Sequence, residues 1–345
     1  MARFVKLRHG NFAPVAAQVK AELAHGLAVV PMLGGYCVLA ADPDKDEAFT
    51  ARFCPVHQLV PGPESLSAEL SAIGEGLTGR ALRVLNGPAV ACFTGAGGVA
   101  LPTDDLSREL THGWRGPLPF GLTEEGTELG ELADDLGRSV AIVVTTEHLE
   151  NVGPTVLDFR TRPVTIDRRG KLAILDIERE LRELVRLGPG IAFSVLVVCT
   201  GNSCRSPMAA GMLARLLAGE RVFIYSAGTD APVGNPATAA AIDAARAVGV
   251  DLASHRARQL SVDMIARADL VLVMDRHHLE RVTSMLPEAG GRTRLLLSYA
   301  GRLDAEVEDP IGRPLEFYHR TVTEMAPALE RVAAEIRQRL GRVTQ

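Results

Sequence analysis

The second half of the 345-residue chain alternates short apolar runs with amphipathic runs, and this alternation constrains the fold more than any other feature. Short apolar runs are typical of buried strands, and apolar residues three or four apart are typical of helices. Strands that alternate with helices form a parallel sheet covered on both faces. We therefore predict a doubly wound α/β domain with a four-stranded parallel sheet. The expected strands are 193–199, 222–227, 268–274 and 294–297, and the expected helices are 207–217, 236–248, 277–286 and 316–340.

A glycine- and proline-rich stretch predicts where this domain begins. Leu187-Gly188-Pro189-Gly190 interrupts both helix and strand, and it follows a helical pattern over 176–187. We expect a first domain over 1–187, a linker over 188–192 and a second domain over 193–345. The first domain is less regular and reads as mixed α/β. Its expected strands are 27–31, 89–93, 141–145 and 155–159, and its expected helices are 48–53, 66–77 and 126–136.

Composition excludes several classes of protein. The net charge of −5 argues against a chain that coats nucleic acid or binds membranes through a polybasic surface. No run approaches the roughly 18 apolar residues of a membrane span, and the start of the chain lacks the apolar core of a secretory signal. The five cysteines are odd in number and widely spread, which is not a disulfide framework. We expect a cytoplasmic protein with free thiols.

The segment from Val197 to Pro207 carries the clearest chemical signal. A strand ends at Cys199, a short loop follows, and Arg205 precedes a Ser-Pro pair suited to the first turn of a helix. A loop between a strand and a helix N-terminus directs successive backbone N–H groups into one concavity, which binds a tetrahedral oxyanion. Arg205 adds a two-pronged donor to that anion. The segment therefore predicts an anion site with a cysteine at its floor.

The position of Cys199 predicts a nucleophile. Near the positive end of a helix, a thiol pKa falls from about 8.5 into a range of roughly 3.5 to 7.5. A thiolate that faces a bound phosphoryl group is placed for in-line attack and a phosphocysteine intermediate. The alternative is a buried cysteine with an arginine nearby by chance. The added Gly201, Asn202, Ser206 and Pro207 make the string far more specific than a cysteine and an arginine alone.

This segment resembles the active-site loop of the low-molecular-weight protein phosphatases. The resemblance extends over about 194–340 and implies a flavodoxin-like fold. Four further motifs follow in order: Tyr225-Ser226-Ala227-Gly228-Thr229, Ser254-His255-Arg256-Ala257-Arg258-Gln259-Leu260, Leu272-Val273-Met274-Asp275 and Glu308-Asp309-Pro310. The last of these matches the loop that carries the family's general acid.

The resemblance implies a role for each matching residue. Cys199 is the expected nucleophile, Arg205 binds phosphate, and Asp309 is the general acid and then the base. Ser206 would hydrogen-bond the thiolate. The phosphate-binding loop comprises Thr200, Gly201, Asn202, Ser203, Cys204 and Ser206, and Asn202 would be braced by Ser226 and His255. We expect no metal and no cofactor, because Arg205 and the loop N–H groups supply the electrostatic stabilisation.

The expected substrates are phosphorylated proteins, and one loop position bears on which kind. Tyrosine-specific members carry a bulky apolar residue where this chain has Ser203, and often aromatic residues after the Asp-Pro pair. Here Ile311-Gly312 follows Asp309-Pro310. The loop is closer to that of the bacterial protein arginine phosphatases, which have threonine at this position. This slightly favours phosphoarginine over phosphotyrosine, and both remain open. A reversible Cys199–Cys204 disulfide is a further hypothesis.

Residues 20–180 resemble the YrdC-like threonylcarbamoyl-AMP synthase domain. The resemblance rests on Leu27–Pro31 with Tyr36–Ala40, and on Gly153–Asp158. The family's Lys-Gly-Arg-Pro segment is replaced here by Phe53-Cys54-Pro55-Val56-His57, and its Ser-Ala-Asn stretch is replaced near 119–122. We therefore expect the same fold with its catalysis lost. The alternatives are retained synthase activity for tRNA modification, or a module that binds a nucleotide, RNA, a substrate protein or a metabolite.

Overall fold

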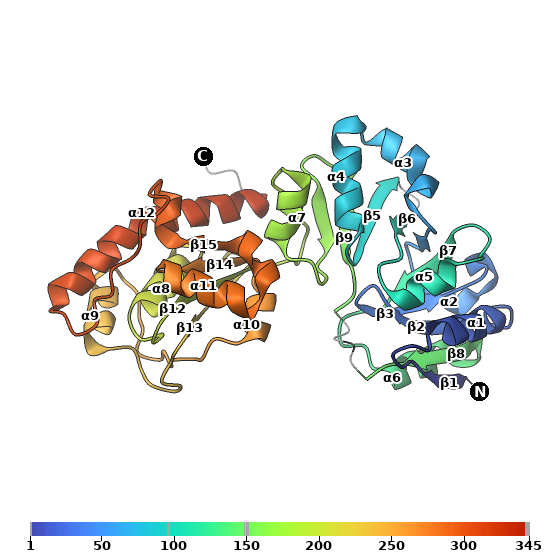
Figure 1. The fold of residues 1–345 in the computed structure, drawn as a ribbon, viewed down its shortest axis with the longest axis horizontal. Coiled ribbons are helices and arrows are strands. Elements are labelled where there is room, and N and C mark those ends of the chain that lie inside the picture. The colour runs from blue at the N-terminus through green and yellow to red at the C-terminus, as the bar shows by residue number, and fades with distance from the viewer. Residues whose placement is uncertain (1, 95–96, 148, 150–151, 342–345) are drawn as a thin grey trace. The chain divides into compact units, whose positions relative to one another are not determined.

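The computed structural model describes residues 2–94, 97–147, 149 and 152–341, and the chain divides into two compact units (Figure 1). The first unit contains the chain up to residue 172 together with 180–188. The second contains 173–179 and the chain from 189 onward. Among the described residues, no helix combines the length and the apolar character needed to cross a membrane.

The first unit is built on one mixed sheet of eleven strands, in the order β1-β8-β2-β3-β7-β4-β6-β5-β9-β10-β11. Its strands are β1 (Arg3–Lys6), β2 (Leu27–Met32), β3 (Gly35–Leu39), β4 (His57–Leu59), β5 (Ala89–Thr94), β6 (Gly97–Ala100), β7 (Leu118–Leu122), β8 (Val140–Thr145), β9 (Thr155–Asp158), β10 (Thr165–Arg168) and β11 (Arg186–Leu187). Its helices are α1 (Phe12–Glu22), α2 (Glu47–Arg52), α3 (Ser67–Ala72), α4 (Glu75–Leu85), α5 (Asp105–Thr111) and α6 (Leu129–Leu136). Apolar side chains of α1 and α5 pack with the strands in one core cluster.

Two local expectations for this half of the chain are wrong. The single helix expected over 66–77 is two helices, because Gly74 has a φ of +86° between α3 and α4. The helix expected over 176–187 is α7 (Ile174–Leu181), which stops where Arg182 has a φ of +56°. The chain then enters the short strand β11, which pairs in parallel with β10. Positive φ angles end a right-handed helix, whatever the apolar spacing beyond them.

The second unit contains the predicted parallel sheet, in the order β13-β12-β14-β15. Its strands are β12 (Phe193–Cys199), β13 (Val222–Gly228), β14 (Leu270–Val273) and β15 (Thr293–Leu295). Its helices are α8 (Arg205–Leu216), α9 (Ala239–Ala247), α10 (Val262–Ala266), α11 (Arg276–Met285) and α12 (Leu315–Arg339). The prediction of an α/β fold with a parallel sheet is confirmed.

The central strand β12 explains why both faces of this sheet are covered. All seven of its residues are buried, and successive side chains point to opposite faces. Leu196 and Val198 join a core cluster with Ile265 of α10 and Val282 of α11. The other face is covered by α8, which contacts β12 and β13 and also packs against α12. A continuous apolar strand is the pattern expected of a parallel sheet buried on both sides.

The segment 173–179 belongs to the second unit because buried polar groups hold it there. Asp269, fully buried, accepts hydrogen bonds from the Ile174 N–H (3.0 Å) and the Ser194 N–H (2.9 Å). Arg339 forms a two-pronged ion pair with Glu178, at 2.8 and 2.9 Å, and is only 5% exposed. The start of α7 therefore forms part of the second unit's structure.

We predict that Glu178→Ala destabilises the second unit by about 3 kcal/mol, because it leaves the buried Arg339 without its main partner. The measurement is urea unfolding of the full chain, followed by hydrogen exchange of the β12 amides. Glu180→Ala is the matched control, since Glu180 pairs with Arg83 at the surface and such pairs contribute at most about 1 kcal/mol. Equal effects of the two substitutions would contradict the prediction.

Candidate active site

The carboxyl ends of three neighbouring strands meet at one edge of the parallel sheet. Cys199 ends β12, Gly228 ends β13, and Asp275 lies two residues beyond β14. Ligands of open parallel sheets bind beyond this edge, because the loops from adjacent strands converge there. A Cβ on Gly228 would lie 2.3 Å from the Thr200 carbonyl oxygen, so only glycine lets the loop pass this close to β13.

Asn202 holds the loop between β12 and α8 in its shape. Its backbone has a φ of +50°, in the left-handed region that non-glycine residues rarely adopt. Its side-chain amide donates to Ser206 Oγ and Ser226 Oγ, both at 2.9 Å, and its Oδ1 accepts from the Arg258 N–H at 2.9 Å. His255 Nε2 donates to the Asn202 carbonyl at 2.7 Å. These bonds offset the backbone strain, and Asn202, Ser206 and Ser226 are all buried.

The hydrogen bonds of Ser206 fix the direction of its proton. Ser206 Oγ accepts from the Asn202 amide and lies 2.9 Å from Cys199 Sγ. Because its oxygen already accepts a bond from Asn202, the hydroxyl proton is available to the sulfur. Cys199 is 3% exposed and Ser206 is fully buried, so water does not compete strongly for this bond. The chain Ser226–Asn202–Ser206–Cys199 thus ends in a donor to the sulfur.

Arg205 begins α8 and is held by four groups of the site. Its Nη1 donates to Asp275 Oδ2 and to the Val307 carbonyl, both at 3.1 Å. Its Nη2 donates to Asp309 Oδ2 at 2.5 Å and lies 3.5 Å from Thr200 Oγ1. The guanidinium is therefore buried between two carboxylates that come from different loops. The arrangement brings Arg205 and Asp309, 104 residues apart in the sequence, into direct contact.

Burial of the sulfur separates the structure from the expected thiol chemistry. The sequence predicts a lowered pKa for Cys199. In the structure, burial raises the pKa of the Cys199 thiol, against the lowering contributions of Ser206, Arg205 and the Asn202 backbone. The positive charge that the sequence analysis relied on is largely balanced by Asp275 and Asp309. The groups that lower the pKa are the ones that the sequence selected, and burial of the sulfur opposes them.

Asp275 and His278 are site residues that the sequence analysis did not select. Asp275 caps α11, and its Oδ1 lies 2.8 Å from His278 Nδ1. His278 is fully buried, and its Nε2 lies 2.9 Å from Thr200 Oγ1. Burial acts to raise the pKa of Asp275, but bonds from His278 and the charge of Arg205 hold it at about 2. The available signal was its position just past a buried parallel strand, the same signal that identified Cys199.

The remaining loop residues contact the start of α9 and α12. Cys204 is buried, with Sγ 3.4 Å from Thr238 Oγ1 and 3.8 Å from the Tyr318 hydroxyl. Ser203 Oγ lies 3.7 Å from Cys204 Sγ, and the Ser203 carbonyl accepts from the Thr238 N–H. Cys199 and Cys204 are both free thiols, and their reversible pairing stays a prediction. Within the described part of the chain, no group of three or more His, Cys, Asp or Glu side chains is placed to hold a metal ion.

The second unit matches a known family of enzymes. A family model described as low molecular weight phosphotyrosine protein phosphatase matches residues 194–342. The low molecular weight protein-tyrosine-phosphatase Etp of Escherichia coli K12 is 37% identical over 149 residues, which is 43% of this chain and 95% of that protein. The protein-arginine-phosphatase of Geobacillus stearothermophilus is 35% identical over 145 residues, 42% of this chain and 96% of that protein.

A solved structure, the YwlE arginine phosphatase from Geobacillus stearothermophilus, is 34% identical and covers 44% of this chain and 99% of that chain, with a TM-score of 0.41. Through residues 194–342 the chain belongs to the low-molecular-weight protein phosphatase family. It is a cysteine-dependent protein phosphatase, as the sequence predicted.

We predict that Asp275→Asn and Asp309→Asn each lower the pKa of Cys199, because each removes a negative charge from Arg205 and leaves more of its positive charge for the thiolate. The rate of Cys199 alkylation by iodoacetamide, measured against pH, reports this value. The midpoint should move to lower pH in both variants. Asp304→Asn is the control, since Asp304 pairs with the exposed Arg276. An unchanged or higher midpoint in both variants would refute the charge balance described here.

Proposed function

We propose that the second unit removes the phosphoryl group from phosphorylated protein side chains through a phosphocysteine intermediate. One observation carries the proposal: the Cys199 sulfur, the Ser206 hydroxyl and the Arg205 guanidinium flank one strand-to-helix loop. The backbone N–H groups of such a loop bind the phosphoryl oxygens. The sulfur then lies behind the phosphorus, opposite the leaving group.

The first step forms a sulfur–phosphorus bond. The Cys199 thiolate attacks phosphorus, and the bond from phosphorus to the side-chain oxygen or nitrogen breaks. Asp309 gives its carboxyl proton to that leaving atom. Arg205 must exchange its contact with Asp309 for two phosphoryl oxygens, while Asp275 and the Val307 carbonyl keep hold of Nη1. A charge-assisted two-pronged bond to the phosphoryl group supports this exchange.

The second step returns the enzyme to its starting state. Asp309, now a carboxylate, takes a proton from water as the water oxygen attacks phosphorus. The sulfur–phosphorus bond breaks, inorganic phosphate forms, and Cys199 leaves as a thiolate. The Ser206 hydroxyl stabilises the sulfur as it regains negative charge. Asn202 contributes indirectly, because it keeps the Ser206 oxygen occupied as an acceptor.

Phosphoarginine is the substrate we favour, with phosphotyrosine as the second candidate. Relatives of both kinds match the second unit at similar identity, so overall similarity does not separate them. The small Ser203 at the rim leaves room for a planar guanidinium and offers a hydroxyl to it. A phenyl ring would instead gain from a bulky apolar side chain at this position.

The test of the mechanism is single-turnover hydrolysis of a phosphoarginine peptide and a phosphotyrosine peptide by the full chain. Asp309→Asn should lower the rate by about 10²- to 10⁴-fold, because it removes the general acid. Cys199→Ser should abolish turnover. Mass spectrometry of the quenched wild-type reaction should find a phosphoryl group on the Cys199 peptide. Full activity of Cys199→Ser would overturn the proposal, as would a phosphoryl group on a different residue.

We predict that Ser203→Leu shifts the ratio of kcat/KM values toward phosphotyrosine. A leucine side chain adds apolar surface for a ring and fills the space of a guanidinium. Burial of one side chain of this size contributes about 1.5 to 3 kcal/mol, so the ratio should change by about tenfold or more. Ser203→Thr is the matched control, since it keeps the hydroxyl. If Ser203→Leu leaves the ratio unchanged, substrate choice lies elsewhere in the site.

We also infer that the first unit is a YrdC-like domain whose synthase chemistry has been lost. Its mixed sheet places Pro31 of β2 beside Tyr36 of β3, the two residues at the centre of the quoted resemblance. The segment that carries the family's cationic Lys-Gly-Arg-Pro holds Cys54 and the buried His57 instead. Loss of these cations removes contacts that a triphosphate needs.

A further inference from the structure

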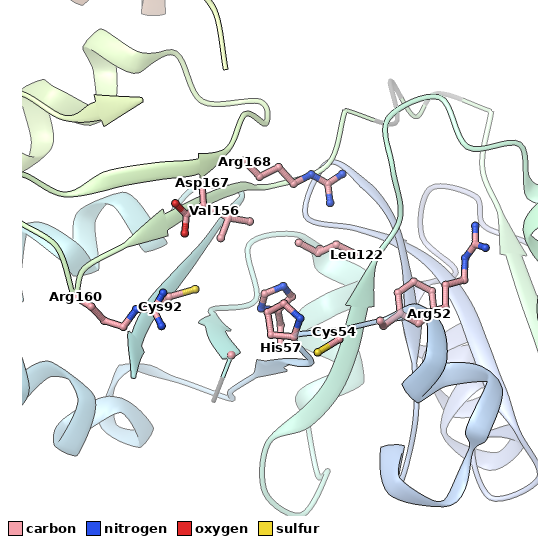
Figure 2. Close-up of a pocket in the computed structure, with 12 residues that line it drawn as sticks. Arg52, Cys54, His57, Cys92, Leu122, Val156, Arg160, Asp167 and Arg168 are labelled. Carbon is pink, nitrogen blue, oxygen red and sulfur yellow. The ribbon is translucent and has the colours of Figure 1, made fainter. Parts of the chain in front are cut away.

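The first unit contains a cavity of about 410 Å³ that the phosphatase chemistry does not use (Figure 2). It is lined from β4, β5, β6, β7, β9 and β10 and from the segment that joins α2 to β4. A volume of this order suits a small organic molecule. Its walls are largely apolar, with Phe53, Pro55, Leu122 and Val156 among the lining residues. A few polar groups are set into these walls.

His57 is the most deeply buried of these polar groups, at 5% exposure. Its Nδ1 accepts a hydrogen bond from the Gly98 N–H at 3.1 Å, so the ring proton of the neutral form is on Nε2. Among the described residues, Nε2 has no hydrogen-bond partner, while the ring lines the cavity. Burial and the charge of Arg168 lower the pKa of His57 to about 4. The cavity therefore contains a neutral donor that lacks an acceptor.

Arg168 supplies the positive charge. It is half-buried at the end of β10 and donates to the Thr123 carbonyl, a neutral group. No carboxylate of the described residues forms an ion pair with it. The two other arginines of the lining differ, because Arg160 is paired with Asp158 and Arg52 with Asp135. Figure 2 shows the Arg52 side chain at the far side of the site from Arg160. Exposed Glu124 and Glu125 act on the Arg168 charge without forming an ion pair, so its N–H groups remain available to a ligand carboxylate.

Asp167 sets an upper limit on the charge of that ligand. It precedes Arg168 and lines the same cavity, where the charges of Asp158 and Arg160 act on it in opposite directions. Its carboxylate would repel a second negative charge on the ligand. A polyphosphate needs several cations, whereas this site offers one unpaired arginine beside an unpaired carboxylate. The lining thus combines apolar walls, one neutral donor, one cation and one anion.

We propose that this cavity binds a small monocarboxylate with an apolar body. The carboxylate would accept from His57 Nε2 and pair with Arg168, and the apolar body would lie against Leu122, Val156 and Phe53. The site is distinct from the phosphatase site in its residues, its unit of the fold and its chemistry. It gives the first unit a ligand-binding role that does not require synthase activity.

The alkylation rate of Cys54 reports whether the cavity is occupied, because Cys54 is an exposed free thiol that lines the cavity. The experiment treats the full chain with iodoacetamide and measures alkylation of the Cys54 peptide by mass spectrometry. The probes are benzoate and isovalerate, with benzamide and isovaleramide as neutral matches of the same shape. Alkylation of Cys199, followed in the same samples, reports any binding at the phosphatase loop.

The carboxylates should slow alkylation of Cys54 in a saturable way, and the amides should not. Arg168→Gln should weaken this protection by at least about tenfold, the change expected from loss of a charge-assisted hydrogen bond. Arg162→Gln is the matched control, because Arg162 donates only to backbone carbonyls and does not line the cavity.

Four outcomes would overturn the proposal. Equal protection by the amides would show that the charge is not recognised. Protection that survives Arg168→Gln unchanged would place the ligand elsewhere. Protection by ATP at lower concentration than by benzoate would identify a nucleotide site. A complete lack of protection by both carboxylates would likewise exclude the assigned ligand class.

Discussion

The strained backbone of Asn202 is the constraint on which the phosphatase site depends. A positive φ at this position bends the loop back over the carboxyl end of β12, and only a full set of hydrogen bonds makes that conformation stable. The partners come from α8, from β13 and from the segment around His255. The loop therefore adopts this conformation only when β13, α8 and the segment around His255 are all folded. This ties the shape of the anion site to the fold of the whole unit.

Charge balance around Arg205 is the second organising feature. A buried guanidinium is stable only when it is paired, and here Asp275 and Asp309 share it. Asp275 is held by His278, which also contacts Thr200 in the loop, so the carboxylate that stays with the arginine is itself oriented. Asp309 lies on a different segment and is more exposed, at 38% of its side chain. This difference suits Asp275 to hold Arg205 in place and suits Asp309 to act on the substrate.

The two units differ in whether these buried polar groups have partners within the protein. In the second unit the buried Arg339 pairs with Glu178, and the buried Asp269 accepts from Ser194. The cavity of the first unit keeps a buried histidine donor and an arginine that forms no ion pair with a described carboxylate. Such groups cost stability unless something binds to them, which is the physical basis for a ligand. Sequence patterns could not reveal this, because Arg168 is too far from Cys54 and His57 in the chain to form a motif with them.

The sequence by itself determined the parallel sheet of the second unit and the family, since buried strands, helical spacing and the string from Cys199 to Pro207 are local properties. It also placed Cys199 and Arg205 on one loop, because seven residues span both. Only the tertiary structure decided which charges surround them. The contacts of Arg205 with Asp275 and Asp309 join residues 70 and 104 positions apart, and burial of the sulfur acts to raise the pKa of Cys199. Electrostatics depends on distance in space, and distance in space is what a one-dimensional pattern does not contain.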